Sequence, residues 1–119
     1  MIEKHSFVEG PLKTNELQQI EETLLPSIER HRLRLLAHCL ACFKEMTNPS
    51  SSGSLPNEQK QLEWCLKQPT LANDQAFIPV LLKQLKVAGD QLEEIATSLG
   101  MTPLELTLTD LINLSKSGN

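Results

Sequence analysis

The chain has 119 residues, a formal net charge of −4, 39% hydrophobic residues and only 3% aromatic residues. This length can bury a hydrophobic core without disulfide staples, and the acidic balance disfavours a general binder of nucleic acid or of anionic membranes. Because aromatic residues are scarce, the composition favours helices over strands. We therefore predict one all-α domain over residues 1–119, a compact bundle of five or six helices.

The cysteine count and the N-terminal sequence predict the cellular compartment of the protein. Three cysteines are an odd number, which does not suggest a disulfide framework. The opening MIEKHSFVEG lacks the apolar stretch of a secretory signal, and no apolar run approaches the roughly 18 residues of a membrane span. We expect a reduced, cytoplasmic protein with no membrane contact.

The N-terminal half is predicted to form a long, kinked helix behind a short arm. Residues 1–13 are treated as the arm, and Thr14 or Asn15 can cap the first free N–H groups of a helix. Apolar residues then recur at spacings of three and four. Pro26 interrupts the pattern, so we expect a kink or a break near Leu25.

The segment 27–46 continues the helix with an apolar face wider than one packing partner would cover. Part of this face must cover the protein's own core, and any surplus implies a homodimer or a protein partner. The predicted interface has apolar anchors flanked by charges: Leu33, Leu36, Leu40 and Phe43, with Arg30 and Arg34 at the rim.

A flexible internal linker is expected at 47–56, where the sequence TNPSSSGSLP is rich in Ser, Pro, Gly and Asn. Beyond it the pattern predicts a cluster of four short helices. Their expected limits follow from capping residues and glycines: 56–67, then from Asp74 to Gly89, from Asp90 to Gly100, and from Thr102 onward with Pro103 and Glu105 in its first turn.

Residues 92–111 resemble the helix-turn-helix motif of phage-repressor-like proteins. Ile95 and Ala96 stand where that family has an apolar residue followed by a small one, 99–101 match its apolar–Gly–apolar turn, and Leu106 falls where the second helix packs back. The resemblance implies a DNA-binding transcriptional regulator that uses residues 90–113, and this is the alternative function.

The charges in this segment oppose that alternative. Neutralisation of phosphates supplies most non-specific DNA affinity, and a recognition helix needs cationic or amide side chains. The segment from 90 to the end instead holds five carboxylates and one lysine: Asp90, Glu93, Glu94, Glu105 and Asp110 against Lys116. We therefore expect no nucleic-acid partner.

Basic residues gather at 30–34, where Arg30, Arg32 and Arg34 surround His31. One interpretation is a solvated flank whose arginines pair with nearby carboxylates. The other is a basic patch that binds an acidic partner protein or, as a weaker alternative, RNA or DNA.

The cysteines leave two interpretations open. Cys39 and Cys42 have CxxC spacing within a predicted helix, and with Cys65 and a histidine they could complete a zinc site. Without a second metal-binding spacing, we expect buried thiols that behave as small apolar residues. No nucleophile–base arrangement or phosphate-binding glycine loop is present, so we predict no enzyme activity, cofactor, metal or small-molecule substrate. The sequence predicts a helical protein that acts by binding other proteins.

Overall fold

The computed structural model describes residues 14–48, 50 and 52–116, and these form helices and turns with no strand. The all-α prediction is confirmed, with five α-helices of eight residues or more in this part of the chain. The elements in chain order are α2 (Thr14–Glu21), α3 (Ser27–Thr47), α4 (Glu58–Lys67), α5 (Pro69–Ala72), η2 (Gln75–Phe77), α6 (Ile78–Leu99), η3 (Pro103–Glu105) and α7 (Leu108–Lys116).

Pro26 separates two helices rather than kinking one. It is the N-cap of α3, and Leu24 before it has a φ of 61°, a left-handed conformation that turns the chain sharply. Thr23 stabilises the turn, because its hydroxyl donates to the carbonyl of Ile20 and accepts from the N–H of Leu25. Of the kink or break expected near Leu25, the break is what forms, so the long N-terminal helix is two helices, α2 and α3.

The second and third short helices predicted in the C-terminal half are one continuous helix, α6. Pro79 occupies the first turn of α6, where proline is tolerated. Gly89 and Asp90, expected at a helix boundary, lie in the middle of the helix. The prediction of a separate helix on each side of Gly89 was wrong, because a glycine can also lie inside a helix.

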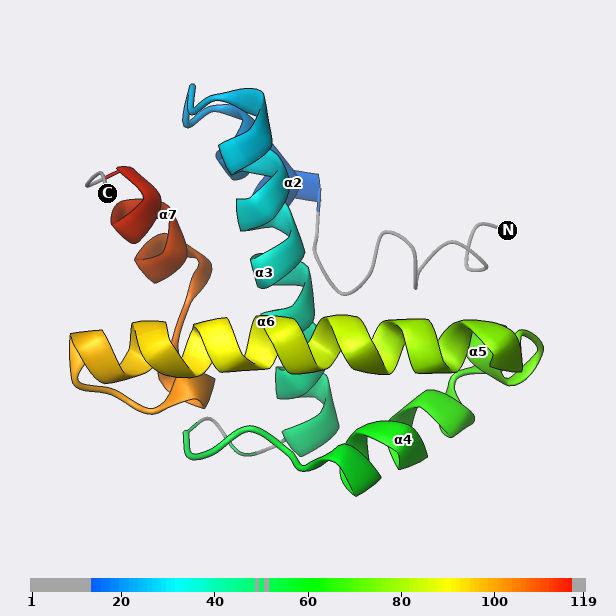
Figure 1. The fold of residues 1–119 in the computed structure, drawn as a ribbon. Helices are drawn as coiled ribbons and strands as arrows, with labels where there is room; N and C mark the ends of the chain where they lie inside the picture. The colour runs from blue at the N-terminus through cyan, green and yellow to red at the C-terminus, as the bar shows by residue number, and fades with distance from the viewer. Residues whose placement is uncertain (1–13, 49, 51, 117–119) are drawn as a thin grey trace.

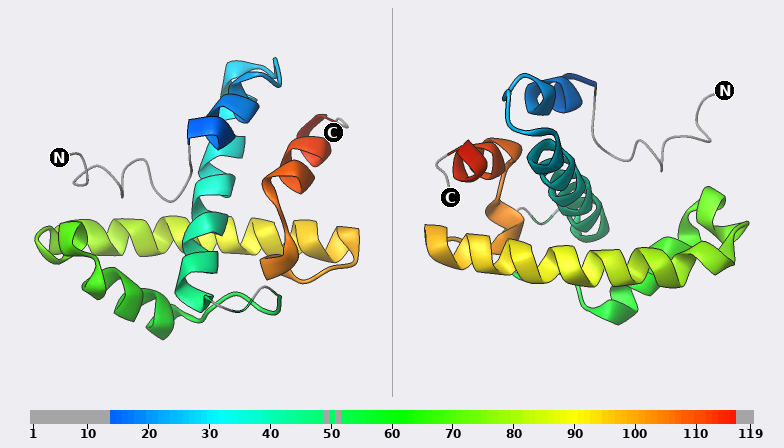
Figure 2. Two further views of the ribbon diagram at one scale, coloured as in Figure 1. Left: turned by 180° about the vertical axis from the view of Figure 1, so that it is seen from behind. Right: turned by 45° about the horizontal axis from the view of Figure 1, so that its top comes forward.

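Gly89 lies where α6 packs against α3. A Cβ built on Gly89 would lie 3.5 Å from Phe43 Cζ of α3, an ordinary contact, and 3.3 Å from a terminal carbon of Leu55, which is slightly tight. Gly89 is therefore buried at the crossing, and an alanine there would need only a small shift of the Leu55 side chain. In Figure 1 the two long helices cross at a steep angle, and Figure 2 shows the same crossing from behind.

Gly100 ends α6 in a left-handed conformation (φ 73°), as the sequence predicted. The Thr102–Glu105 capping box also forms, but the turn it caps is the three-residue η3. A second reciprocal pair then starts α7: the Thr107 N–H donates to the Asp110 carboxylate, and the Asp110 N–H donates to the Thr107 hydroxyl.

This interruption departs from the helix-turn-helix geometry on which the DNA-binding alternative rests. A helix-turn-helix motif needs a continuous second helix to enter the major groove. Residues 106 and 107 are not helical, and the helix begins only at Leu108. The segment is a corner of the fold, fixed to α3 by a hydrogen bond from Lys44 Nζ to the carbonyl of Leu106.

Some of the described residues between α3 and α4 pack against the rest of the chain. The Gly53 N–H donates to the Thr102 hydroxyl at 2.9 Å, and the Leu104 N–H donates to the Gly53 carbonyl at 3.3 Å. Leu55 contacts the Gly89 position, and Pro56 is buried. Gly53 and Leu55, within the linker predicted at 47–56, are thus held against η3 and α6, and the flexibility of the rest of that segment stays a prediction.

The hydrophobic core draws on every long helix. The largest fully buried side chains are Phe43, Ile20, Leu33, Leu71, Leu85, Leu92, Leu106 and Leu111, with Cys39, Cys42 and Cys65. Residues far apart in the sequence thus share one core around the crossing of α3 and α6.

Replacement of Phe43 by alanine tests this core. Because Phe43 is fully buried at the crossing, Phe43→Ala is expected to lower the free energy of unfolding by about 3–5 kcal/mol in urea denaturation. Leu35→Ala, on the partly exposed side of the same helix, should cost less than about 1 kcal/mol. Equal losses for the two variants would contradict the placement of Phe43 in the core.

Candidate protein-binding groove

The four apolar residues predicted as interface anchors lie in the protein's own core. Leu33, Leu36, Leu40 and Phe43 have exposed fractions of 1%, 7%, 4% and 0%. The apolar face of α3 is wide because α3 contacts α2, α4, α6, η3 and α7. Most of the surface of each side chain packs against the protein's own helices, so the predicted anchors are corrected to core residues.

The two predicted rim charges hold α2 against α3. Arg34 Nη1 lies 2.9 Å from a Glu21 carboxylate oxygen, and Arg30 Nε lies 3.5 Å from the other. Arg30 also donates to the carbonyl of Leu25 at the turn between the two helices. This part of the basic cluster therefore matches the interpretation of arginines paired with nearby carboxylates.

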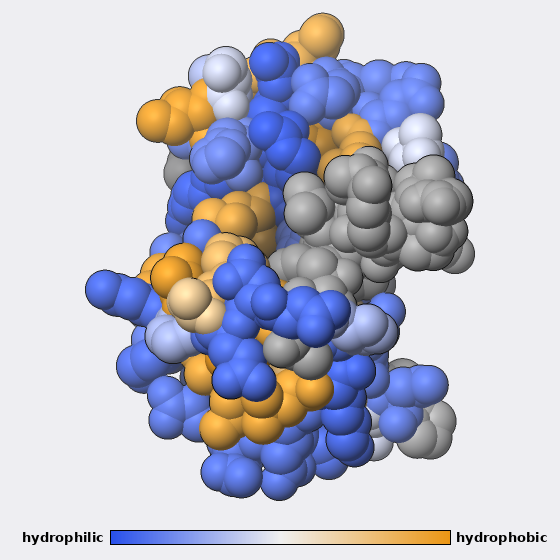
Figure 3. Space-filling model, turned by 90° about the vertical axis from the view of Figure 1, so that its right-hand side faces the viewer, coloured by the Kyte–Doolittle hydropathy of each residue, from blue (hydrophilic) through white to orange (hydrophobic). Residues whose placement is uncertain are grey.

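The exposed apolar side chains lie elsewhere on the molecule. Eight large hydrophobic residues are exposed in the described part of the chain, and four of them line one groove between α3 and α6. These four are Ile28, Leu35, Val80 and Val87, with exposed fractions of 76%, 41%, 49% and 52%. On the face that Figure 3 shows, apolar patches alternate with hydrophilic surface.

We call this hollow, of about 460 Å³, the α3–α6 groove. Leu36 and Ala88, both buried, form its floor, where the two helices diverge from their crossing. Ile28 and Leu35 are seven residues apart on α3, and Val80 and Val87 are seven apart on α6. Residues at this spacing share one helix face. Each helix thus contributes two exposed apolar side chains to the groove.

Cationic and amide side chains lie between the two apolar residues of each pair. His31 and Arg32 stand between the pair on α3, and Lys83 and Gln84 between the pair on α6. No carboxylate occurs among the described residues that line the groove. Within the described chain, Arg32 and Lys83 have no ion pair, whereas Arg30, Arg34 and Lys86 do. The groove is therefore apolar with a positive rim, on a chain whose net charge is −4.

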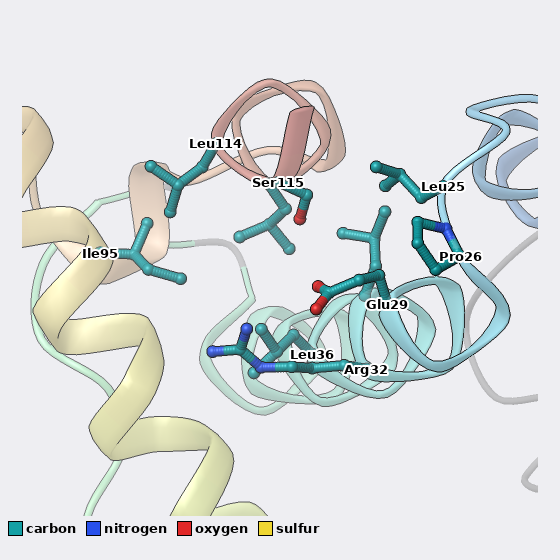
Figure 4. Close-up of a pocket in the computed structure, with 10 residues that line it drawn as sticks. Leu25, Pro26, Glu29, Arg32, Leu36, Ile95, Leu114 and Ser115 are labelled. Carbon is teal, nitrogen blue, oxygen red and sulfur yellow. The ribbon is translucent and has the colours of Figure 1, made fainter. Parts of the chain in front are cut away.

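A second hollow, of about 650 Å³, lies between α3, the end of α6 and α7. We call it the α3–α7 hollow. Figure 4 shows Glu29 and Arg32 of α3 at this hollow, with Ile95 of α6 and Leu114 of α7 on the far side. Arg32 also lines the α3–α6 groove, so it stands on the ridge between the two hollows.

The α3–α7 hollow is the weaker candidate for a binding site. Three of its apolar residues, Leu33, Leu36 and Leu111, belong to the core, and Leu114 is its one large exposed hydrophobic side chain. A contiguous exposed apolar surface is the feature that marks a protein-binding site. The α3–α6 groove has that feature.

The cysteines support the interpretation of buried, apolar thiols. Burial raises the pKa of Cys39 to about 11, and burial together with the neighbouring Cys39, Glu45 and Cys65 raises the pKa of Cys42 further. Burial also raises the pKa of Cys65. A reactive or metal-binding thiol needs a lowered pKa. In the described part of the chain, no three His, Cys, Asp or Glu side chains are grouped so that they could hold a metal ion.

The exposed surface of the second half of α6 is acidic. Asp90, Glu93 and Glu94 line a shallow depression together with Thr97 and Ser98. The only ion pair among these carboxylates in the described structure is a long one, 4.0 Å from Lys86 to Asp90. This surface would repel phosphates, and the absence of a nucleic-acid partner stays a prediction.

Comparison with protein families gives a match over residues 12–118, nearly the whole chain, to the family described as NDH complex assembly factor CRR9. The chain belongs to the CRR9 family. Comparisons with curated proteins and with solved structures give no significant match. An assembly factor acts without catalysis, which is consistent with the predicted non-enzymatic, protein-binding role. Among the described helices of this CRR9-family chain, none is long and apolar enough to cross a membrane.

The groove residues were missed because sequence patterns do not show which face of a helix is exposed. The apolar face predicted over 27–46 did not separate the residues that the fold buries from those that it leaves exposed. Pairs of apolar residues seven apart with a cation between them occur at 28–35 and at 80–87. The same pattern occurs at 33–40 and 78–85, whose apolar residues are buried, so it does not mark the exposed pairs.

Thiol reactivity tests the burial of the cysteines in this CRR9-family protein. The raised pKa values mean that few thiolates exist in the native chain at pH 8, and burial also blocks access. We expect the native protein to react with Ellman's reagent at least about a hundredfold more slowly than the same protein in urea, where all three thiols become available. Rapid modification of the native protein would contradict the buried placement.

Proposed function

We propose that this protein takes part in assembly of the NDH complex by binding a partner protein in the α3–α6 groove. The observation that carries the proposal is the gathering of Ile28, Leu35, Val80 and Val87, half of the large exposed hydrophobic residues of the described chain, in one hollow. Membership of the CRR9 family is the reason to propose assembly of the NDH complex as the process.

Burial of these side chains gives a physical reason for binding. Removal of apolar surface from water contributes about 25 cal/mol per Å², and the floor of the groove is already formed by the packed crossing of α3 and α6. A preformed groove loses little conformational freedom on binding. An assembly factor of this kind would shield an apolar segment of a subunit until its final contacts form.

A second copy of the chain is the other protein partner that the sequence suggested, and a homodimer stays a prediction. The cytoplasmic location expected from composition also stays a prediction. The proposal depends on neither prediction, because the groove would bind a subunit segment in a monomer as well as in a dimer.

Complementation tests the proposal in cells. In the organism that encodes the protein, deletion of its gene is expected to lower the amount of assembled NDH complex on native gels, and the wild-type gene should restore it. Ile28→Asp combined with Val87→Asp places charges in the apolar groove, and we expect it to restore less than about a tenth of the complex.

Leu66→Asp is the matched control, since Leu66 is 47% exposed on α4 and does not line the groove. It should restore the complex fully, and urea denaturation should show that all variants remain folded. If deletion left the NDH complex intact, the assembly role would be wrong. Full restoration by the double groove variant would show that the groove is not needed for assembly.

A further inference from the structure

We propose that the segment bound in the α3–α6 groove is an amphipathic helix of a partner protein, with a carboxylate between two apolar residues that lie about two turns apart. This inference rests on the proposed function and specifies the chemistry of the partner. It follows from the order of side chains along α3 and α6, from the charge of the groove and from the elements that line it.

The groove favours a helix over an extended strand. Strand addition requires the free edge of a sheet, and the described chain contains no strand. Two helices line the groove, over residues 28–36 of α3 and 80–91 of α6. A helix in a groove presents apolar side chains at spacings of three, four and seven residues. The pairs at 28 and 35 and at 80 and 87 have the same seven-residue spacing.

The charges on the two lining helices define what lies between the partner's apolar residues. Arg32 on α3 and Lys83 on α6 each follow the first apolar residue of their pair by three or four positions. Neither has an ion pair within the described chain. Because α3 and α6 cross steeply, a partner helix can run along only one of them. A carboxylate in its middle would face the cation of that helix, Arg32 or Lys83, whereas a lysine there would be repelled. Such complementarity sets specificity more than raw affinity.

A second copy of this chain fits the groove less well through its acidic surface. The depression that carries Asp90, Glu93 and Glu94 is otherwise lined by Thr97 and Ser98, so it offers carboxylates without apolar side chains. An anionic membrane would meet the same three carboxylates elsewhere on α6 and a chain of net charge −4. A partner protein with both apolar and acidic side chains fits the groove best.

Photo-cross-linking in cells identifies the occupant. The substitution Gln84→p-benzoyl-L-phenylalanine puts the cross-linker in the groove and leaves the apolar residues and both cations intact. We expect it to capture one segment of another protein, and mass spectrometry should show carboxylates between apolar residues in a helical pattern. The same cross-linker at Gln59, an exposed residue of α4 outside the groove, is the background control.

Charge reversal tests the acidic character of the segment. Arg32→Glu combined with Lys83→Glu is expected to lower the yield of the cross-link about fivefold, the effect of losing a rim ion pair. Lys60→Glu combined with Lys67→Glu changes the net charge equally on exposed positions of α4 and should leave the yield unchanged. Replacement of the partner's carboxylates by lysine should restore the yield with the charge-reversed groove.

The outcomes separate this inference from the proposed function. Capture of a partner segment without carboxylates, or a yield unaffected by charge reversal, overturns the inference and leaves the groove as a docking site. Capture of a second copy of this chain, recognised with isotope-labelled mixtures, or of lipid, also overturns it. A yield at Gln84 no greater than at Gln59 overturns the proposed function itself.

Discussion

The packing of α3 against α6 around Phe43 is the contact on which the rest of the structure depends. Phe43 is fully buried beside Gly89, and Leu55 packs over the same point. Two helices that cross steeply diverge on either side of their contact. The elements α4 and η3 each contact both helices, and α7 contacts α3. One space between the diverging helices stays open in the described structure. It is the α3–α6 groove, lined by Ile28, Leu35, Val80 and Val87.

The distribution of polar groups suits a protein that acts by binding. Arg30 and Arg34 serve the fold through Glu21, and Lys44 holds the turn before α7. The cysteines are buried with raised pKa values, so the chain keeps no activated thiol among them. Membership of the CRR9 family gives this arrangement a context, since an assembly factor needs a surface for a partner rather than a catalytic centre.

Local patterns predicted the helical class and the cap at Gly100, because these depend on a few neighbouring residues. A glycine followed by a capping residue looks the same at a helix boundary and inside a helix, so the continuity of α6 through Gly89 could not be predicted from the local pattern. The same limit applies to the binding surface. An apolar stripe predicts that a helix packs against something, but the burial of Leu33, Leu36, Leu40 and Phe43 is decided by the whole fold.

The central claim is that the α3–α6 groove is covered when the protein is bound to an NDH assembly intermediate. Carbene footprinting of side chains, on the free protein and on the purified intermediate, tests this most directly. The account predicts that labelling of Ile28, Leu35, Val80 and Val87 falls severalfold on binding, while Leu66 and Leu99, also exposed in the free chain, keep their labelling. Protection of Leu66 or Leu99 with the groove residues still labelled would contradict it.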